Sequence, residues 1–182
     1  MHSLNFILYH TLMQTDLWGP HEWNSMQYKA FGSPEVFDRE AKQLYARYFE
    51  TNARIIPCSM CQMAFGNMMN YIPIDSYLDG RDGLCFWIFM MHNLVNRKLE
   101  KPLHVFSHVI LKYENDRARC GSKNDVEKYA LCKKELQPYT MEMAESKARA
   151  IKSKYGEISY VHLENYYRSN TVIDPKYHKC DL

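Results

Sequence analysis

Glycine is scarce in this chain, with 7 residues among 182. Neither the G-x-G-x-x-G turn of dinucleotide-binding folds nor the G-x-x-x-x-G-K-[ST] phosphate loop occurs. A nucleotide bound by this chain therefore has to be held by another kind of site. The formal net charge is only +2, so no excess of positive charge supports binding to nucleic acid.

Long apolar runs are also missing, and none is long enough to span a bilayer. The stretch from Met1 to Leu12 is partly apolar, but it lacks the basic start and the small-residue cleavage site of a secretory signal peptide. We therefore expect a cytoplasmic protein without a membrane span. In that compartment, metal or redox chemistry explains a close pair of cysteines better than a framework of structural disulfides does.

No segment shows the alternating pattern of a strand, whereas apolar residues recur at helical spacing, which predicts an all-α helix bundle. Asp16 is expected to cap the first helix, and Ser33 the second, with Pro34 in its first position. The most apolar helix should lie at the centre. The expected helices are Trp23–Phe31, Pro34 to the early fifties, one that begins at Pro57 and is broken at Tyr71–Asp75, Leu84–Leu99 and Val105–Tyr113.

A polar, charged stretch from Asn115 to Asp125 marks a change in composition. We place a boundary there, with one domain over residues 1–115 and a C-terminal extension over residues 116–182. Two charge-rich amphipathic helices are expected in the extension, Val126–Leu136 and Met141–Tyr155, followed by an irregular tail.

Two of the six cysteines, Cys58 and Cys61, form a C-x-x-C motif directly after Pro57. The N–H groups and the dipole at a helix start favour the thiolate, which is the attacking species in disulfide exchange. Redox chemistry is one interpretation, although a thioredoxin-like unit would place a strand before the motif. Zinc is a second, but it normally needs another close ligand pair, which the spacing of Cys120 and Cys132 does not supply. Two buried structural cysteines are the third.

The most apolar of the expected helices carries a polar group near its end. His92, Asn93 and Asn96 are three or four residues apart and so lie on adjoining rows of the helix surface. Asparagine is a poor helix former, and these amides could bind a heterocycle while Lys98 and Lys101 neutralise phosphates. A solvated polar face, with His92 as a core histidine, is the alternative.

Three motifs occur in order along the chain: Trp18-Gly19-x-x-x-Trp23, Pro57-Cys58-x-x-Cys61, and Trp87-x-x-x-x-His92-Asn93-x-Val95-Asn96-x-Lys98-Leu99-x-Lys101-Pro102. In letters, order and separation they resemble the Erv/ALR family of FAD-linked sulfhydryl oxidases. The resemblance covers roughly residues 16–113, and the His-Asn-x-Val-Asn block is its most specific part. The Trp-Gly-Pro opening is most similar to members encoded by large DNA viruses, the African swine fever virus type among them.

The resemblance implies a four-helix bundle with a short fifth helix, which binds FAD and usually forms a homodimer. Cys61 would be the cysteine next to the flavin, and Cys58 the one that exchanges with substrate thiols. Such a protein oxidises protein dithiols, or a thioredoxin-like relay protein, and passes the electrons to dioxygen to give hydrogen peroxide. The FAD-contact positions would be Trp23, Gln27, Phe31, His92, Asn93, Val95, Asn96, Lys98, Lys101, Lys112 and Tyr113.

The sequence departs from the family pattern at three places. Gln27 stands where many members have a histidine, and an amide can still hydrogen-bond to the flavin. Pro20 replaces a basic residue. Phe89 and Phe106 occupy the positions of a structural disulfide, which a buried aromatic contact can replace.

The other cysteines are less specific. Cys85 is expected to be a buried free thiol. Cys120 and Cys132 could form a shuttle or a structural disulfide, and Cys180 is a third candidate, although an extension used for dimerisation or docking is the simpler interpretation. The alternative function is a helical interaction module with structural zinc on Cys58, Cys61 and His92. A family member that binds FAD without turnover is disfavoured because both redox cysteines are present.

Overall fold

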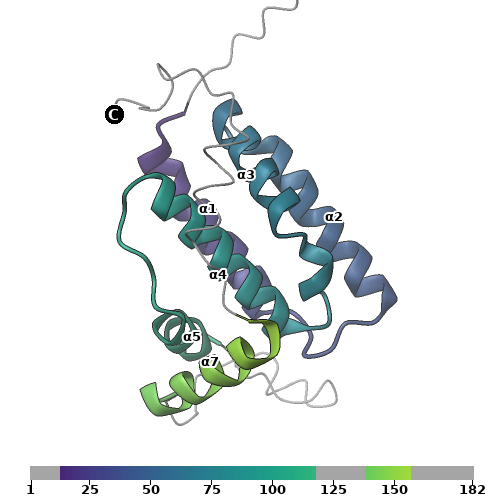
Figure 1. The fold of residues 1–182 in the computed structure, drawn as a ribbon, viewed down its shortest axis with the longest axis vertical. Helices are drawn as coiled ribbons and strands as arrows, with labels where there is room; N and C mark the ends of the chain where they lie inside the picture. The colour runs from purple at the N-terminus through teal and green to yellow at the C-terminus, as the bar shows by residue number, and fades with distance from the viewer. Residues whose placement is uncertain (1–12, 118–137, 157–182) are drawn as a thin grey trace, which may run out of the picture.

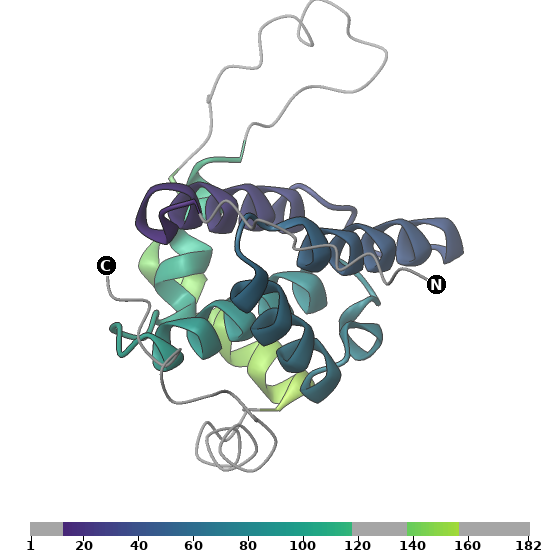
Figure 2. The same cartoon turned by 90° about the horizontal axis from the view of Figure 1, so that it is seen from above.

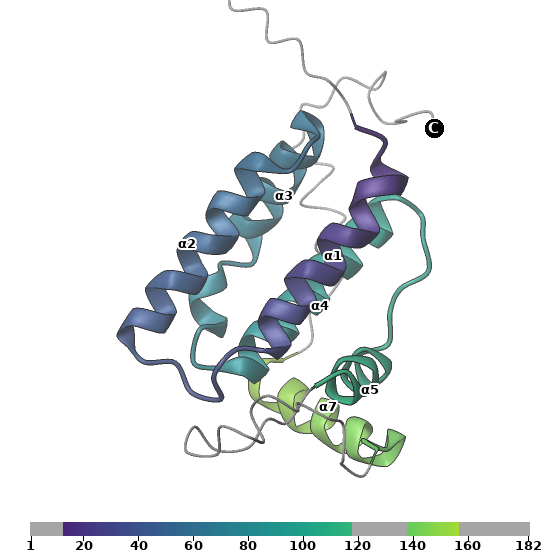
Figure 3. The same cartoon turned by 180° about the vertical axis from the view of Figure 1, so that it is seen from behind.

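The computed structural model describes residues 13–117 and 138–156, and these form helices with no strand among them. The elements are α1 (Thr15–Phe31), α2 (Arg39–Ile55), α3 (Ser59–Tyr71), the 3-10 turn η1 (Ile74–Tyr77), α4 (Arg81–Lys98), α5 (Phe106–Asn115) and α7 (Met141–Tyr155). Helices α1 and α2 form one layer and α4 and α3 the other (Figures 2 and 3), with α5 and α7 across one end (Figure 1). The expected all-α bundle with a short fifth helix is confirmed.

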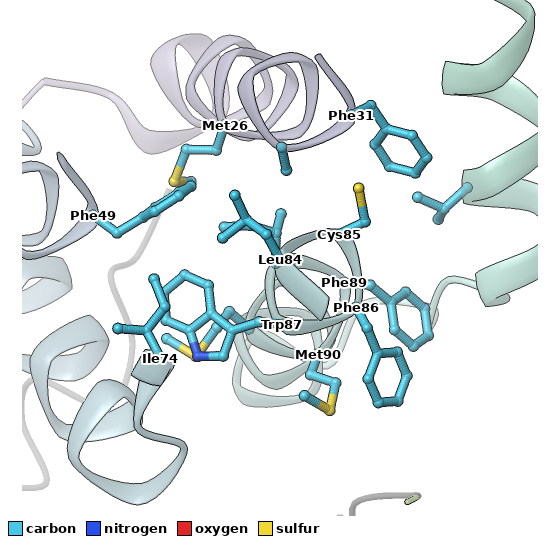
Figure 4. Close-up of a cluster of buried hydrophobic side chains, with 14 of the residues drawn as sticks. Met26, Phe31, Phe49, Ile74, Leu84, Cys85, Phe86, Trp87, Phe89 and Met90 are labelled. Atoms are coloured by element: carbon cyan, nitrogen blue, oxygen red, sulfur yellow. The ribbon is translucent and has the colours of Figure 1, made fainter. Parts of the chain in front are cut away.

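Helix α4 is the centre of the core, as its composition predicts. Every residue from Leu84 to Met91 is buried, and their side chains radiate toward the surrounding helices (Figure 4). A helix that is apolar on all sides has to be covered on all sides. Trp87 is fully buried, and its indole N–H donates to the Ile72 carbonyl at 2.9 Å, so its one polar atom is paired.

The expected start of the second helix is wrong. Helix α2 begins at Arg39, where the Asp38 carboxylate accepts a hydrogen bond of 2.8 Å from the Ala41 N–H. Ser33 instead donates its hydroxyl to the Ala30 carbonyl at the end of α1. Residues 33–37 lie outside any helix, and their backbone bonds to the start of α4 and the residue pair before it, through Arg81 N–H to the Pro34 carbonyl and Phe37 N–H to the Asp79 carbonyl.

Three other starts also differ from the expected ones. Helix α1 begins at Thr15 with Gln14 as its N-cap, so Asp16 lies in its first turn and Pro20 inside it. Helix α3 begins at Ser59, two residues after Pro57. Helix α4 begins at Arg81, before the expected Leu84, because its first turn is held by the contacts to residues 33–37. Propensity alone contains no information on such contacts between distant segments.

Helix α7 is placed as the sequence predicts, from Met141 to Tyr155. It packs on α4 and α5 through Ala144, Ala148 and Ile151, which are buried. Lys147 adds ion pairs to Asp82 of α4 at 2.9 Å and to Glu114 of α5 at 3.2 Å. The expected helix over 126–136, with Cys120 and Cys132, lies outside the described residues, as does Cys180.

Phe89 and Phe106 join α4 to the start of α5. Their ring centroids are 4.6 Å apart and both side chains are buried, which confirms the expected aromatic contact. Cys85, one turn before Phe89, is a free buried thiol, also as expected. Burial raises the pKa of this thiol, so Cys85 is unsuited to thiolate chemistry.

Two helical glycines provide a test of this packing. At Gly66 of α3 a Cβ would contact nothing within 4 Å, whereas at Gly83 of α4 it would lie 2.7 Å from the Tyr155 hydroxyl and closer still to the Tyr77 carbonyl oxygen. Gly66→Ala is therefore expected to stabilise the protein by up to about 1 kcal/mol. Gly83→Ala should destabilise it by about 1–3 kcal/mol through overpacking. Denaturant unfolding of both variants measures the difference, and equal free energies would contradict the close approach of α7 and η1 to α4.

Candidate active site

The two cysteines of the C-x-x-C motif lie at the start of α3 and form a disulfide, with their Cα atoms 5.1 Å apart. Cys58 is the N-cap, and its sulfur accepts a hydrogen bond of 3.2 Å from the Cys61 N–H. The turn before the helix is fixed at the Ile56 carbonyl, which accepts from the Cys58 N–H at 2.7 Å and from the Gln62 side chain at 2.8 Å.

Both cysteines are shielded from solvent, and Cys58 is the more buried of the two. Cys61 is three, four and seven residues before Ala64, Phe65 and Met68, the buried residues of α3, so it lies on the inner face of the helix and packs against the core. Cys58 has an exposed fraction of only 5%. An incoming thiolate can therefore reach Cys58 only after a local rearrangement around the start of α3.

A row of side chains on α1 continues from this disulfide. Trp23, Gln27 and Phe31 are four residues apart and share one helix face. The Trp23 ring lies 6.0 Å from Phe65, which is one turn after Cys61, and Phe31 stacks on Tyr113 of α5 at 5.1 Å. The row thus extends from the helix of the disulfide to α5.

Gln27, in the middle of this row, carries an unpaired polar atom. The side chain is 2% exposed, and its Oε1 has no hydrogen-bond partner among the described residues. A buried acceptor left without a partner costs about 1–3 kcal/mol. Such an atom is accounted for if a bound ligand donates a hydrogen bond to it, and the ring system of a flavin carries an N–H group that can do so.

His92 of α4 completes an aromatic stack with Trp23. The two rings are nearly parallel, 8° apart in orientation, with centroids 4.2 Å apart. Burial, with smaller contributions from His104, Lys101 and Lys112, lowers the pKa of His92 to about 3. The imidazole is therefore neutral at physiological pH and can stack on, or hydrogen-bond to, an uncharged heterocycle.

The two asparagines of α4 hold the segment that follows it. Asn93 is 1% exposed, accepts from the His104 N–H at 2.8 Å and donates to the His104 carbonyl at 3.0 Å. The carbonyl of Asn96, which is also buried, accepts from the Lys101 N–H at 2.8 Å. Both residues therefore shape the 99–105 loop, a role that the sequence did not predict.

Three of the expected cofactor residues are lysines at the surface. Lys101 pairs with the Asp16 carboxylate at 3.3 Å, and Lys112 donates to the Asn24 side chain at 3.2 Å. Lys98 is exposed at the end of α4, and Val95 packs against the core from the same helix. Asn24 also accepts the Tyr113 hydroxyl at 2.8 Å, so it joins α1 to both candidate residues of α5.

The zinc interpretation has no support in this geometry. The disulfide between Cys58 and Cys61 leaves neither sulfur as the thiolate that zinc requires. Residues 13–117 and 138–156 contain no group of three His, Cys, Asp or Glu side chains placed to hold a metal ion.

Within the same ranges, no helix is long and apolar enough to cross a membrane.

A family model described as Erv1 / Alr family matches residues 20–116, more than half of the chain. The chain belongs to this family. The matched segment includes α1 from residue 20 onward and all of α2 to α5, with the C-x-x-C disulfide and the aromatic row. The expected family membership is thereby confirmed, and α7 lies beyond the matched segment.

Two viral relatives of the Erv1 / Alr chain support the expected resemblance to members from large DNA viruses. A FAD-linked sulfhydryl oxidase of Acanthamoeba polyphaga mimivirus is 27% identical over 99 residues, 54% of this chain and 69% of that protein. A FAD-linked sulfhydryl oxidase of Invertebrate iridescent virus 3 is 26% identical over 97 residues, 53% of this chain and 66% of that protein. Nothing in these relatives singles out the African swine fever virus type.

Two solved structures share the fold. The FAD-binding domain of Erv1 from Saccharomyces cerevisiae superposes with a TM-score of 0.54 at 21% identity, covering 58% of this chain and 98% of the yeast domain. The yeast Erv1 core gives 0.53 at 20% identity, covering 63% and 97%. At this level of identity the comparison shows the helical fold and no more.

Two residues at the site were missed by sequence reasoning. His104 lies against His92, with ring centroids 4.5 Å apart, and Asn24 bonds to α5. Neither residue belongs to a motif, and neither has a helical spacing relative to the residue it contacts. Only the three-dimensional arrangement of α1, α4 and α5 brings them to the site.

Proposed function

We propose that this protein is an FAD-dependent thiol oxidase that forms disulfide bonds in substrate proteins. The observation that carries the proposal is the Cys58–Cys61 disulfide, with Cys61 on the inner face of α3, beside an aromatic row that contains an unpaired buried amide oxygen. Membership of the Erv1 / Alr family and the names of the viral relatives support the same activity.

The proposed FAD site combines three kinds of groups. Rings from α1, α4 and α5 supply stacking surfaces, amides supply hydrogen bonds, and lysines near the 99–105 loop supply charge for phosphates. When bound, FAD would supply a two-electron acceptor that passes its electrons to dioxygen and yields hydrogen peroxide. The residues of this proposed site are Trp23, Gln27, Phe31, His92, Asn93, Val95, Asn96, Lys98, Lys101, Lys112 and Tyr113.

The cysteines perform the exchange chemistry in this proposal. A substrate thiolate attacks the Cys58 sulfur, forms a mixed disulfide and releases Cys61 as a thiolate on the inner face of α3. The second substrate thiol, as a thiolate, attacks its partner's sulfur and releases Cys58. The substrate dithiol has then lost two electrons and two protons, and Cys58 and Cys61 have gained the two electrons.

The start of α3 assists the second step. The Cys61 N–H already points at the Cys58 sulfur at 3.2 Å, and the N-terminus of a helix stabilises negative charge. Cys58 is therefore a good leaving group when the mixed disulfide is resolved, because a stabilised thiolate leaves faster. This supports Cys58 as the cysteine that exchanges with substrates.

The proposed partners are defined by their chemistry. Protein dithiols and dioxygen follow from the activity, whereas a thioredoxin-like relay protein, a homodimer and a cytoplasmic location are further parts of the proposal. Gel filtration with light scattering would measure the oligomeric state directly.

The first test of the activity is the visible absorption spectrum of the purified protein, recorded before and after dithiothreitol is added in air. An oxidase should show a flavin spectrum that bleaches and then recovers while oxygen is consumed and peroxide accumulates. A colourless protein that cannot be reconstituted with FAD, particularly one that carries zinc, would refute the proposal and favour the interaction module.

Gln27→Leu separates the cofactor role of this residue from its role in packing. Leucine fills a similar volume without a polar atom, so the cofactor-free protein should be as stable as the parent or more stable by about 1 kcal/mol. Loss of the hydrogen bond should weaken FAD binding about tenfold. Thermal unfolding and a fluorescence titration with FAD measure the two effects. Undiminished FAD affinity would show that the amide oxygen does not face the cofactor.

A further inference from the structure

The 99–105 loop is held in place by buried groups of α4. His104 lies in this loop, and both its backbone N–H and its carbonyl bond to the Asn93 amide, which is 1% exposed. The Lys101 N–H bonds to the Asn96 carbonyl in the same loop. Bonds to buried partners leave the loop backbone little freedom, so the position of the His104 side chain is determined by α4.

The His104 ring is thereby brought to the cofactor side of α4. Its centroid is 4.5 Å from that of His92, the ring that stacks on Trp23. His104 itself is at the surface and can be reached by a ligand that covers His92.

The charges around these two imidazoles are mostly positive. The positive charges of Lys101 and Lys112 lower the pKa of His92, and that of Lys112 also lowers the pKa of His104. A carboxylate also lies beside this group, that of Asp16 of α1, which pairs with Lys101 at 3.3 Å. Burial and the nearby ammonium groups lower the pKa of both histidines. A cluster in which positive charge is crowded and imidazoles are kept neutral is suited to a ligand with multiple negative charges, such as a diphosphate.

We propose that His104 is a further cofactor-binding residue, whose imidazolium donates a hydrogen bond to the phosphates of the bound dinucleotide. The inference rests on the proposed FAD site and goes beyond it, because no motif of the chain includes His104. It also adds a property that the lysines cannot supply: binding becomes dependent on pH near neutrality.

The direction of this dependence follows from linkage. A phosphate beside His104 favours the charged imidazole and raises its pKa above the value in the cofactor-free protein. FAD binding then takes up a proton, so affinity rises as the pH falls through the pKa of the complex and levels off below that of the free protein. Burial keeps His92 neutral over this range.

The test is a titration of the cofactor-free protein with FAD, followed by fluorescence, between about pH 8 and about pH 5.5. The parent protein is expected to bind FAD about fivefold more tightly at the lower pH. His104→Gln keeps a side chain that can donate a hydrogen bond but cannot be charged, so it should bind at the higher pH like the parent and lose the gain at the lower pH. His108→Gln, an exposed histidine on α5, is the matched control and should behave like the parent.

Riboflavin, which has the ring system but no phosphate, tests whether His104 interacts with the phosphates of the cofactor. The affinity of the protein for riboflavin should not depend on the protonation of His104. Equal pH profiles for the parent and His104→Gln, or the same pH dependence with riboflavin, would overturn the role of His104 while leaving the oxidase proposal intact. Failure of the parent to bind FAD at any pH would overturn both. Side-chain NMR of His104 should show its pKa rise when FAD is added.

Discussion

Replacing Cys61 by serine is expected to abolish thiol oxidation, lowering turnover by about a thousandfold or more. Serine cannot form a disulfide, and Cys61 lies on the inner face of α3, against the core and one turn before Phe65, whose ring lies 6.0 Å from that of Trp23. Without it, electrons from a substrate have no path from Cys58 to the cofactor. Oxygen consumption with dithiothreitol or a reduced protein substrate measures the loss.

Cys58→Ser should be equally inactive but different in its spectrum. In the proposed site this variant would leave Cys61 as a free thiol next to the flavin, so its thiolate should give a broad charge-transfer band at long wavelength. Cys61→Ser should lack that band, because its remaining sulfur is the N-cap of α3 and is bonded to a backbone N–H. The band in the Cys61→Ser protein would reverse the roles of the two cysteines.

Cys85→Ala is the control for these two substitutions. Cys85 is a buried free thiol of α4 whose raised pKa keeps it protonated, so its removal should leave turnover near that of the parent. Comparable losses in all three variants would mean that cysteine replacement harms the fold rather than the chemistry. FAD content, measured on each purified variant, separates these cases.

The local features of the fold could be predicted from the sequence because they depend on neighbouring residues. The apolar composition of α4 predicts its burial and helical spacing predicts the limits of α7, while the resemblance to the family, in which these two positions form a disulfide, predicts the contact between Phe89 and Phe106. The end of α1 is equally local: Gly32 follows its last residue.

The starts of α2 and α4 could not be predicted, because each depends on the other. Residues 33–37 would continue as helix by propensity, with Ser33 and Pro34 as good starting residues. Their carbonyl and N–H groups instead bond to Asp79 and Arg81, some 45 residues later. Contact between distant segments outweighs a local preference of this size, which is about 1 kcal/mol for a cap.

At the candidate site, too, features that depend on the local sequence could be predicted, and features that depend on contacts between distant segments could not. The cysteines and the α4 motif could be identified from letters and spacing, and the structure brings Trp23, His92 and Phe65 together as neighbours. The burial of Cys58, the unpaired oxygen of Gln27 and the contact of His104 with His92 depend on how three helices pack. Assignment of each residue to FAD remains a prediction for the experiments above.

Helix α7 adds a second group of contacts to the bundle, and its loss should be costly. Ala148 is 6% exposed where α7 packs on α4 and α5, whereas Ala150, two residues later, is exposed. Ala148→Glu would place a carboxylate in the interface and should lower the free energy of unfolding by about 3 kcal/mol or more. Ala150→Glu makes the same chemical change at the surface and should alter it by less than about 0.5 kcal/mol.

The expected difference in melting temperature is about 10 °C, read by circular dichroism on both variants. Lys147, the cation next to Ala148 in the sequence, is already paired with the carboxylates of Asp82 and Glu114. Similar melting temperatures for the two variants would mean that α7 does not pack on α4 and α5 in solution. A lower melting temperature for Ala148→Glu alone would instead show that α7, a helix of the C-terminal extension, is part of the core. The folded domain would then extend past residue 115, the boundary drawn from composition.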